Sequence, residues 1–187
     1  MNKSRIEAFT DAVIAIIITI MVLELNLPKE ITFSSLFNMW PTVFVYIASF
    51  LQILVVWLGH HDLFNEIETM SYTLFVYNGI WLLTQSFVPI GTRAVGESPT
   101  LPAVVLYLGI LSLWSFAWML LYHQAALENP SLLQSSKKSL KPRTAWVYQA
   151  NLLLFLIISL IIPNFISYLP LLMVMTTSYN MLRYSPN

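Results

Sequence analysis

The sequence predicts an all-α integral membrane protein, and its composition and patterning together lead to this fold class. Hydrophobic residues make up 57% of the 187 residues and charged residues only 10%, whereas about 25% are charged in a typical soluble domain. A surface so poor in charge cannot face water over most of its area. Six apolar stretches are also long enough to cross a bilayer as helices, which takes about 20 residues. No hydrophilic block between them is long enough to form a soluble domain.

The six predicted transmembrane helices belong to a single domain over residues 1–187. They cover residues 6–27, 40–59, 70–90, 102–122, 145–162 and 165–181. Prolines lie near their ends, where the missing backbone N–H is tolerated. Pro28 ends the first helix, Pro41 lies in the first turn of the second, and Pro89 lies at the end of the third. A tight turn at Pro163 makes the last two helices antiparallel neighbours, and Pro170 is expected to kink the sixth.

The distribution of Lys and Arg predicts that both termini lie in the cytoplasm, because cytoplasmic loops carry an excess of basic residues. With the N-terminus inside, the outer loops hold only Lys29 and Arg93. The inner segments hold Lys3, Arg5, Lys137, Lys138, Lys141, Arg143 and Arg183. The first apolar run continues to Leu27 and lacks a small-x-small cleavage site, so we expect a retained helix rather than a signal peptide.

Several function classes find no support in the sequence. The absence of cysteine excludes disulfides and thiolate metal sites, and a net charge of zero gives no basis for a nucleic-acid partner. No nucleophile–base pair, phosphate loop or zinc pattern indicates an enzyme or a cofactor. A membrane-embedded enzyme using His60, His61 and Asp62 is a remote alternative, because adjacent helical histidines point about 100° apart whereas a shared metal prefers i, i+4 spacing.

The first helix carries an apolar stripe on one side. Drawn at 100° per residue, this narrow face consists of Ile16, Ile20, Leu23 and Leu27. Thr19 lies about 60° from Ile16, on the shoulder of the face. Such spacing usually indicates helix packing, and periodicity alone favours that interpretation over a functional one.

The same helix also contains ionisable residues, which are costly in a spanning segment and normally face protein or water. Asp11 lies about 140° from the centre of the stripe, so we expect it to face neighbouring helices. Arg5 lies on a different side from Asp11, and each is expected to have a partner elsewhere. His60 and His61 in the second helix lie at the right depth to be these partners, and Asn78 in the third helix is a deeper candidate. These residues predict a structural polar network.

A short motif opens the first helix. It consists of Arg5, Phe9, Thr10 and Asp11. With Thr in place of Ser, it resembles the Arg-x-x-x-Phe-Ser-Asp signature of the transmembrane protein 175 family of potassium channels. The continuation DAVIAIIITIMVLEL is similar to that family's first helix, and so is the Trp57-x-x-His60-His61 pattern that ends the second. Asn78 and Pro89 in the third helix also match, and the resemblance to the six-helix bacterial members covers the whole chain.

The resemblance implies a homotetramer in the plasma membrane of a bacterium, with four first helices lining a central pore. It also implies the absence of a TVGYG carbonyl filter, and the sequence contains none. The family's hydrophobic constriction corresponds to Ile16, with further apolar rings at Ile20 and Leu23. Thr19 corresponds to a threonine linked to potassium preference. The family's hydroxyl residue just before the constriction is replaced by Ala15, so one hydroxyl ring is missing.

These implications predict a passive, potassium-preferring cation channel with a hydrophobic gate and no cofactor or metal other than the permeant ion. A narrow ring of isoleucines blocks ions by excluding water. Glu24 is either a carboxylate at the outer mouth that concentrates cations, or a solvated helix end or a bridge to a neighbouring subunit. The alternative is a proton- or ion-coupled secondary transporter in which Asp11, His60 and Glu24 titrate, although the sequence shows no internal repeat and no helix broken mid-membrane.

Overall fold

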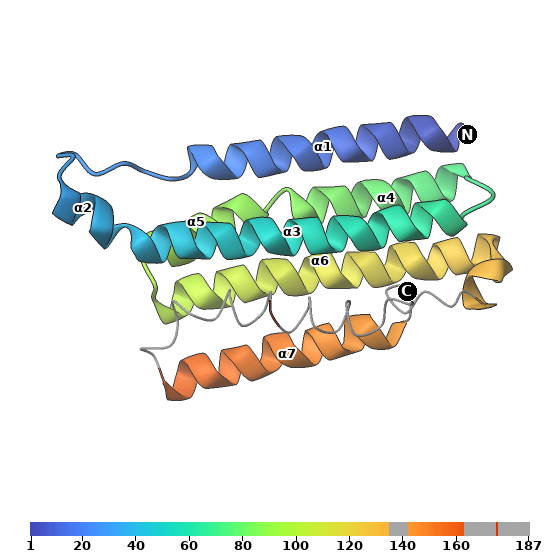
Figure 1. The fold of residues 1–187 in the computed structure, drawn as a ribbon. Coiled ribbons are helices and arrows are strands. Elements are labelled where there is room, and N and C mark those ends of the chain that lie inside the picture. The colour runs from blue at the N-terminus through green and yellow to red at the C-terminus, as the bar shows by residue number, and fades with distance from the viewer. Residues whose placement is uncertain (135–141, 163–174, 176–187) are drawn as a thin grey trace.

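The computed structural model describes residues 1–134, 142–162 and 175, and all regular structure within them is helical (Figure 1). The elements are α1 (Lys3–Leu23), α2 (Phe33–Asn38), α3 (Trp40–Glu66), α4 (Tyr72–Gln85), α5 (Val88–Glu97), α6 (Leu101–Glu128), the 3-10 helix η1 (Pro130–Gln134) and α7 (Pro142–Ile161). Among them, α1, α3 and α6 are long and apolar enough to cross a membrane, and α7 contains a shorter apolar helix. The predicted all-α class is thus confirmed for the described residues. Pro163, Pro170 and all of the predicted helix over 165–181 except residue 175 lie outside them.

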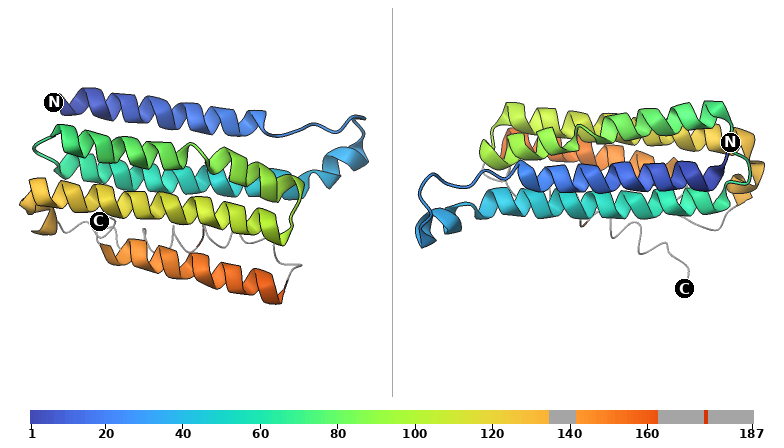
Figure 2. Two further views of the ribbon diagram at one scale, coloured as in Figure 1. Left: turned by 180° about the vertical axis from the view of Figure 1, so that it is seen from behind. Right: turned by 90° about the horizontal axis from the view of Figure 1, so that it is seen from above.

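The helices form a layered bundle with α1 along one side (Figures 1 and 2). One face of α1 packs against α3, α4 and α5, while α6 packs against α4, α5 and α7. The core between these layers contains large, fully buried side chains. They include Met21, Ile53, Trp81, Leu111 and Leu121. Because α1 is an edge helix, the described helices cover only one of its faces.

The first helix is shorter than predicted, since α1 ends at Leu23 rather than at residue 27. The N–H of Leu25 bonds to the carbonyl of Val22 at 3.2 Å, a three-residue step that tightens a final helical turn. Pro28 then disfavours the helical backbone at the residue before it. The end of the predicted stripe, Leu27, therefore lies in the connection and not on the helix.

The connection after α1 contains a short helix, α2, that the sequence analysis treated as loop. The side chain of Thr32 accepts a hydrogen bond from the N–H of Ser35, and Ser35 caps Thr32 in return. This reciprocal cap stabilises the first turn. None of the α2 residues is buried, and Phe33 is 95% exposed. The Thr-x-x-Ser spacing was the available sequence signal for this helix.

Two spanning helices extend beyond their predicted ends. The helix predicted over 40–59 continues as α3 to Glu66, and the helix predicted over 102–122 continues as α6 to Glu128. In α3 the added turns bury Leu63 and Phe64 completely. The end of α3 after residue 59 looks polar in sequence, but its apolar side chains pack into the core, and this packing stabilises the added turns.

The helix predicted over 70–90 is in fact two helices, α4 and α5, with a break between Gln85 and Val88. Pro89 lies in the first turn of α5 and has no backbone N–H, so the carbonyl of Gln85 lacks the donor expected four residues later. The chain nevertheless continues in the same general direction alongside α3 (Figure 1). A proline predicted to end a helix instead breaks it, and α5 extends the segment to Glu97.

Candidate pore helix and its anchoring contacts

The two faces of α1 differ in burial. Its buried residues are Ile6, Thr10, Ile14, Ile17 and Met21. The predicted stripe lies elsewhere on the helix: Ile16 is 56% exposed, Ile20 41% and Leu23 78%. Within the part of the chain that the structure describes, the bundle therefore covers the opposite side of α1 and leaves the stripe unpacked. Packing against the described helices of this chain therefore does not account for the stripe.

Thr19 lies exposed beside this stripe, and its hydroxyl donates a hydrogen bond to the carbonyl of Ile16 at 2.8 Å. A hydroxyl has one proton and two acceptor lone pairs. With the proton directed into the helix, the oxygen lone pairs are available on the exposed side. Thr19 thus offers an acceptor oxygen of the kind that can contact a cation. Ala15, in the preceding turn, is also exposed but contributes no polar atom.

Three fully buried polar side chains join α1 to α3 and α4. The amide nitrogen of Asn78 donates to the hydroxyl of Thr10 at 2.8 Å, and the amide oxygen of Asn78 lies 2.9 Å from Nε2 of His60. Because a carbonyl oxygen can only accept, this arrangement assigns the proton to Nε2 of the histidine. The structure thus brings together His60 and Asn78, which the sequence placed in one network, and joins them to Thr10 of the α1 motif.

The His60 ring is also held by aromatic neighbours. It stacks on Trp81 with ring centroids 4.7 Å apart and planes 8° from parallel, and on Phe64 at 4.2 Å. Such packing restricts the ring to one orientation. Among the described residues, no group of histidines and carboxylates has the arrangement of a metal site. The surroundings of His60 are those of a structural anchor.

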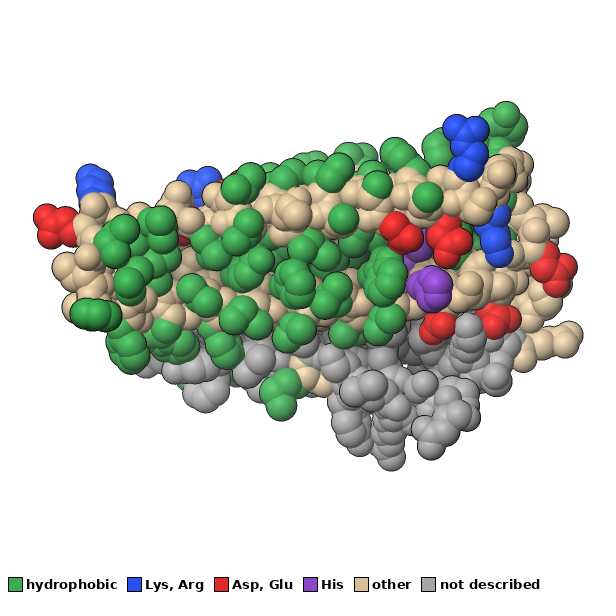
Figure 3. Space-filling model, turned by 45° about the horizontal axis from the view of Figure 1, so that its top comes forward, with side chains coloured by type: hydrophobic (Ala, Val, Ile, Leu, Met, Phe, Trp, Pro, Cys, Tyr) green, Lys and Arg blue, Asp and Glu red, His purple; other side chains and the backbone are tan. Residues whose placement is uncertain are grey.

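Asp11 has a partner that the sequence analysis did not identify. Its Oδ1 accepts a hydrogen bond from the indole Nε1 of Trp57 at 2.8 Å. Nearby, the carboxylate of Glu7 lies 3.5 Å from Nδ1 of His61, and the His61 ring stacks on Trp57. Figure 3 shows acidic and histidine side chains gathered toward this end of the molecule, beside a largely hydrophobic face. The first half of α1 is therefore joined to α3 at its half-buried edge.

Arg5 and Phe9, the other two motif residues, do not join this network. Both are exposed, and no hydrogen bond or ion pair connects the Arg5 side chain to a described residue. On a helix at 100° per residue they lie about 20° on either side of Ile16. They therefore share the uncovered face of α1 with the stripe.

Lys3 contributes more than the positive charge that predicts the orientation of the chain, because it also anchors α1. Its ammonium group donates to the backbone carbonyls of Phe64 and Ile67, at 2.8 and 2.9 Å. These carbonyls belong to the last turn of α3 and its cap, where unpaired acceptors and the helix dipole favour a cation. Sequence could not reveal this contact, because the extension of α3 beyond residue 59 was not predicted.

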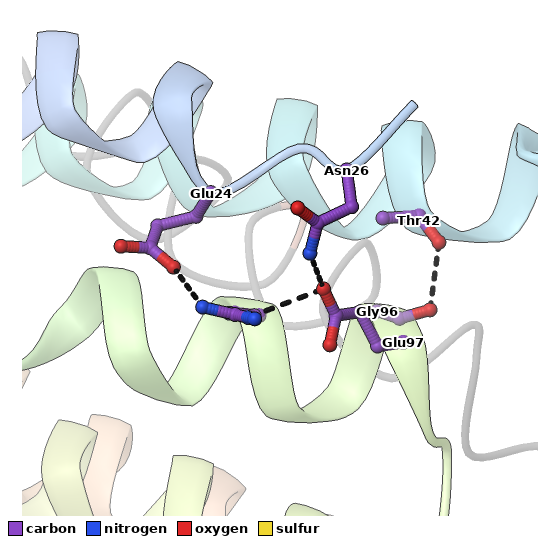
Figure 4. Close-up of polar contacts among 6 residues, drawn as sticks. Glu24, Asn26, Thr42, Gly96 and Glu97 are labelled. Atoms are coloured by element: carbon purple, nitrogen blue, oxygen red, sulfur yellow. Dashed lines mark hydrogen bonds and ion pairs between the residues drawn. The ribbon is translucent and has the colours of Figure 1, made fainter. Parts of the chain in front are cut away.

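A polar cluster lies at the opposite end of α1 (Figure 4). The guanidinium of Arg93 on α5 donates to Glu24 at 3.0 Å and to Glu97 at 3.1 Å. The amide of Asn26 also donates to Glu97. Hydrogen bonds to Glu24 and then Glu97 raise the pKa of Arg93. The carboxylate of Glu24 is therefore paired within its own chain.

Comparison with known proteins identifies relatives of this arrangement. Residues 5–89 match the family described as endosomal/lysosomal potassium channel TMEM175. A potassium channel of Chamaesiphon minutus is 33% identical over 147 residues, which cover 73% of this chain and 72% of that protein. A potassium channel of a Chryseobacterium species is 41% identical over 98 residues, about half of each protein.

A solved structure extends the similarity to the complete fold. The crystal structure of a lysosomal potassium-selective channel TMEM175 homologue from Chamaesiphon minutus superposes with a TM-score of 0.77 and 28% identity. The superposition covers 98% of both chains. The matched region includes the α1 motif, the stripe and the network residues of α3 and α4. This chain is a membrane protein that belongs to the TMEM175 family of potassium channels.

Proposed function

We propose that this protein is a passive, potassium-preferring cation channel in which four copies of α1 line a central pore. The observation that carries the proposal is the uncovered stripe on α1. Ile16, Ile20 and Leu23 lie on the face that the subunit does not cover, whereas Ile17 and Met21 on the other side are almost fully buried. A single helix cannot enclose a pore, but a symmetric ring of four can.

In this assembly the stripe forms the hydrophobic constriction. Side chains of Ile16, Ile20 and Leu23 from four subunits would form successive apolar rings along the axis. A narrow apolar ring excludes water and so prevents ion passage, while a modest outward movement of the helices rewets it. Conduction is therefore controlled by the position of α1 and needs no catalytic group or bound cofactor.

Thr19 supplies the polar contribution to selectivity. Its hydroxyl proton is used within the helix, which leaves the oxygen to replace part of the water shell of a passing cation. Potassium is held less tightly by its water than sodium, so a ring of weak oxygen ligands favours potassium modestly. With Ala15 one turn earlier, this chain has a single hydroxyl ring at that level of the pore.

The remaining site residues position α1. Thr10, His60 and Asn78 form the buried anchor, and Asp11 adds the bond to Trp57. Glu24 is half of an ion pair with Arg93, so its charge is largely balanced and its attraction for cations at the pore mouth is weak. We further propose that the end of α1 carrying Lys3 faces the cytoplasm of a bacterial cell, in keeping with the distribution of basic residues.

The proposal is tested by reconstituting the protein in liposomes and measuring flux and reversal potential under potassium and sodium gradients. We expect potassium-selective flux from an assembly whose mass in detergent corresponds to four copies. Ile16→Asn should increase leak and weaken selectivity, because a polar side chain hydrates the constriction. The matched control is Leu113→Asn, since Leu113 on α6 is also 56% exposed but lies outside the stripe.

Three results would contradict the proposal. Absence of flux for both ions would argue against a channel, and saturable, pH-driven uptake would favour a coupled carrier instead. Equal effects of Ile16→Asn and Leu113→Asn would show that Ile16 does not lie at the constriction.

A further inference from the structure

We propose that Arg93 is a positioning residue for the pore helix. Together with Glu24, Asn26 and Glu97 it forms a latch that holds the Leu23 end of α1 against α5 and favours the conducting state (Figure 4). The inference rests on the proposed role of α1 in lining the pore, and it extends that role to a residue on another helix.

The first argument is the distribution of polar contacts along α1. Side-chain hydrogen bonds and ion pairs from α1 to other described helices occur only up to Asp11 and again from its cap, Glu24. Between these points the only side-chain hydrogen bond to a described residue is that of Thr19 to its own helix. The segment that carries the constriction residues is therefore held by apolar packing alone, and the latch restrains its free end.

The second argument is that α5 is a firm support. The hydroxyl of Thr42 on α3 donates to the carbonyl of Gly96 at 2.7 Å. A Cβ atom on Gly96 would lie 3.1 Å from the methyl group of Thr42, so the two helices approach closely there. Further along α5, Thr92 donates to Ser49 at 2.9 Å, and Ser49 also bonds to Tyr107 on α6. A latch to α5 thus ties α1 to both α3 and α6.

The third argument concerns strength. Arg93, Glu24 and Glu97 have side chains that are 48%, 30% and 37% exposed. Exposed ion pairs of this kind are weak and are screened by salt. A contact this weak cannot hold a fold together, but it can shift the balance between two positions of a helix. Its removal is expected to change the conducting fraction about two- to fivefold.

The geometry also gives the direction of the effect. Glu24 lies about 80° around the helix from the centre of the stripe but only about 20° from Ile17, on the face that the subunit buries, and its carboxylate reaches toward α5 (Figure 4). The latch therefore draws the Leu23 end toward its own subunit and away from the pore axis. Release lets this end move toward the axis and narrows the ring at Leu23. Loss of the latch should consequently lower potassium flux.

Variants in liposomes separate this role from a simple charge effect at the pore mouth. The latch predicts that Arg93→Gln and Glu24→Gln both lower the open probability in single-channel recordings, with unitary conductance unchanged. A mouth-charge role predicts opposite changes in conductance, because Arg93→Gln frees a carboxylate whereas Glu24→Gln removes one. Lys29→Gln, a charge removal at an exposed position in the same connection, is the matched control and should leave open probability unchanged.

A charge exchange completes the functional test. The double variant Glu24→Arg/Arg93→Glu should restore open probability toward that of the original protein, because it re-forms the pair. Failure of this rescue, unchanged open probability in either single variant, or opposite conductance changes would each overturn the latch.

A structural readout keeps the latch testable even if the protein does not conduct. The sequence has no cysteine, so spin labels can be attached to cysteines introduced at the exposed positions Leu27 and Ile90, in labelled subunits diluted with unlabelled ones. Arg93→Gln should lengthen and broaden the distance distribution between them, whereas Lys29→Gln should not. An unchanged distribution would reject the latch, and absence of flux with a changed distribution would reject only the channel function.

Discussion

The two ends of α1 are held by polar contacts of opposite character. At the first end, Thr10, Asn78 and His60 are fully buried, and Asn78 bonds to each of the other two. At the other, Glu24 and Arg93 meet at an exposed surface. Breaking a buried pair leaves an unsatisfied polar group in a medium that cannot replace it, whereas water readily replaces an exposed partner. The comparison indicates a helix with a fixed end and an adjustable end.

The largest expected effect follows from removing the centre of the buried network. Asn78→Leu leaves the hydroxyl of Thr10 and Nε2 of His60 without their partner, at a cost of about 2–4 kcal/mol in the free energy of unfolding. Unfolding in mixed detergent micelles measures this loss. Val76→Leu, at an exposed position on the same helix, should be nearly neutral. A small effect of Asn78→Leu would remove the basis for calling this end fixed.

A smaller loss is expected at the half-buried contact beside that network. Trp57→Phe keeps an aromatic ring next to His61 but removes the N–H that donates to Asp11. Hydrogen bonds to charged groups contribute about 1.5–3 kcal/mol, and partial exposure places this one toward the lower value. Trp146→Phe, at an exposed site on α7, serves as the control in the same unfolding measurement. Equal losses in the two variants would contradict a specific role for the Trp57 bond.

The anchor at the end of α3 should contribute less again. Lys3→Met retains much of the aliphatic chain but removes the ammonium that donates to the carbonyls of Phe64 and Ile67. A cation at a helix C-terminus is worth about 0.3–1 kcal/mol. Thermal unfolding should show a correspondingly small decrease for Lys3→Met and none for Lys29→Met. A decrease as large as that of Asn78→Leu would mean that the network is not the main anchor.

The smallest effect concerns the exposed end and sharpens the contrast most directly. Raising the salt concentration from about 0.1 to 1 M shortens the screening length from about 10 to 3 Å. The open probability of the original protein should fall toward that of Arg93→Gln, while the variant itself changes little. The stability loss of Asn78→Leu should be insensitive to salt, because the groups are buried and uncharged. Equal salt sensitivity at both ends would eliminate the proposed difference between them.

Sequence was sufficient where one local property dominates. The shortage of charge and the apolar runs predicted a helical membrane protein, and the cost of polar residues in a spanning helix placed His60 and Asn78 in one predicted network. It was insufficient where several elements must meet. The partner of Asp11 is Trp57, a residue noted only for its place in a family pattern, and hydrogen-bonding capacity alone does not distinguish an indole from the nearby histidines.

The stripe on α1 shows the same division between what sequence can predict and what it cannot. Periodicity placed Ile16, Ile20 and Leu23 on one face of a helix, because the α-helical repeat follows from backbone geometry alone. Periodicity could not tell whether other helices cover that face. All faces of a membrane-spanning helix are apolar, so the pattern does not show which one packs against protein. Only the packing of α3, α4 and α5 against the opposite face left the stripe open. Likewise, only the break at Pro89 and the course of α5 brought Arg93 to Glu24, because their contact depends on two distant segments meeting in space.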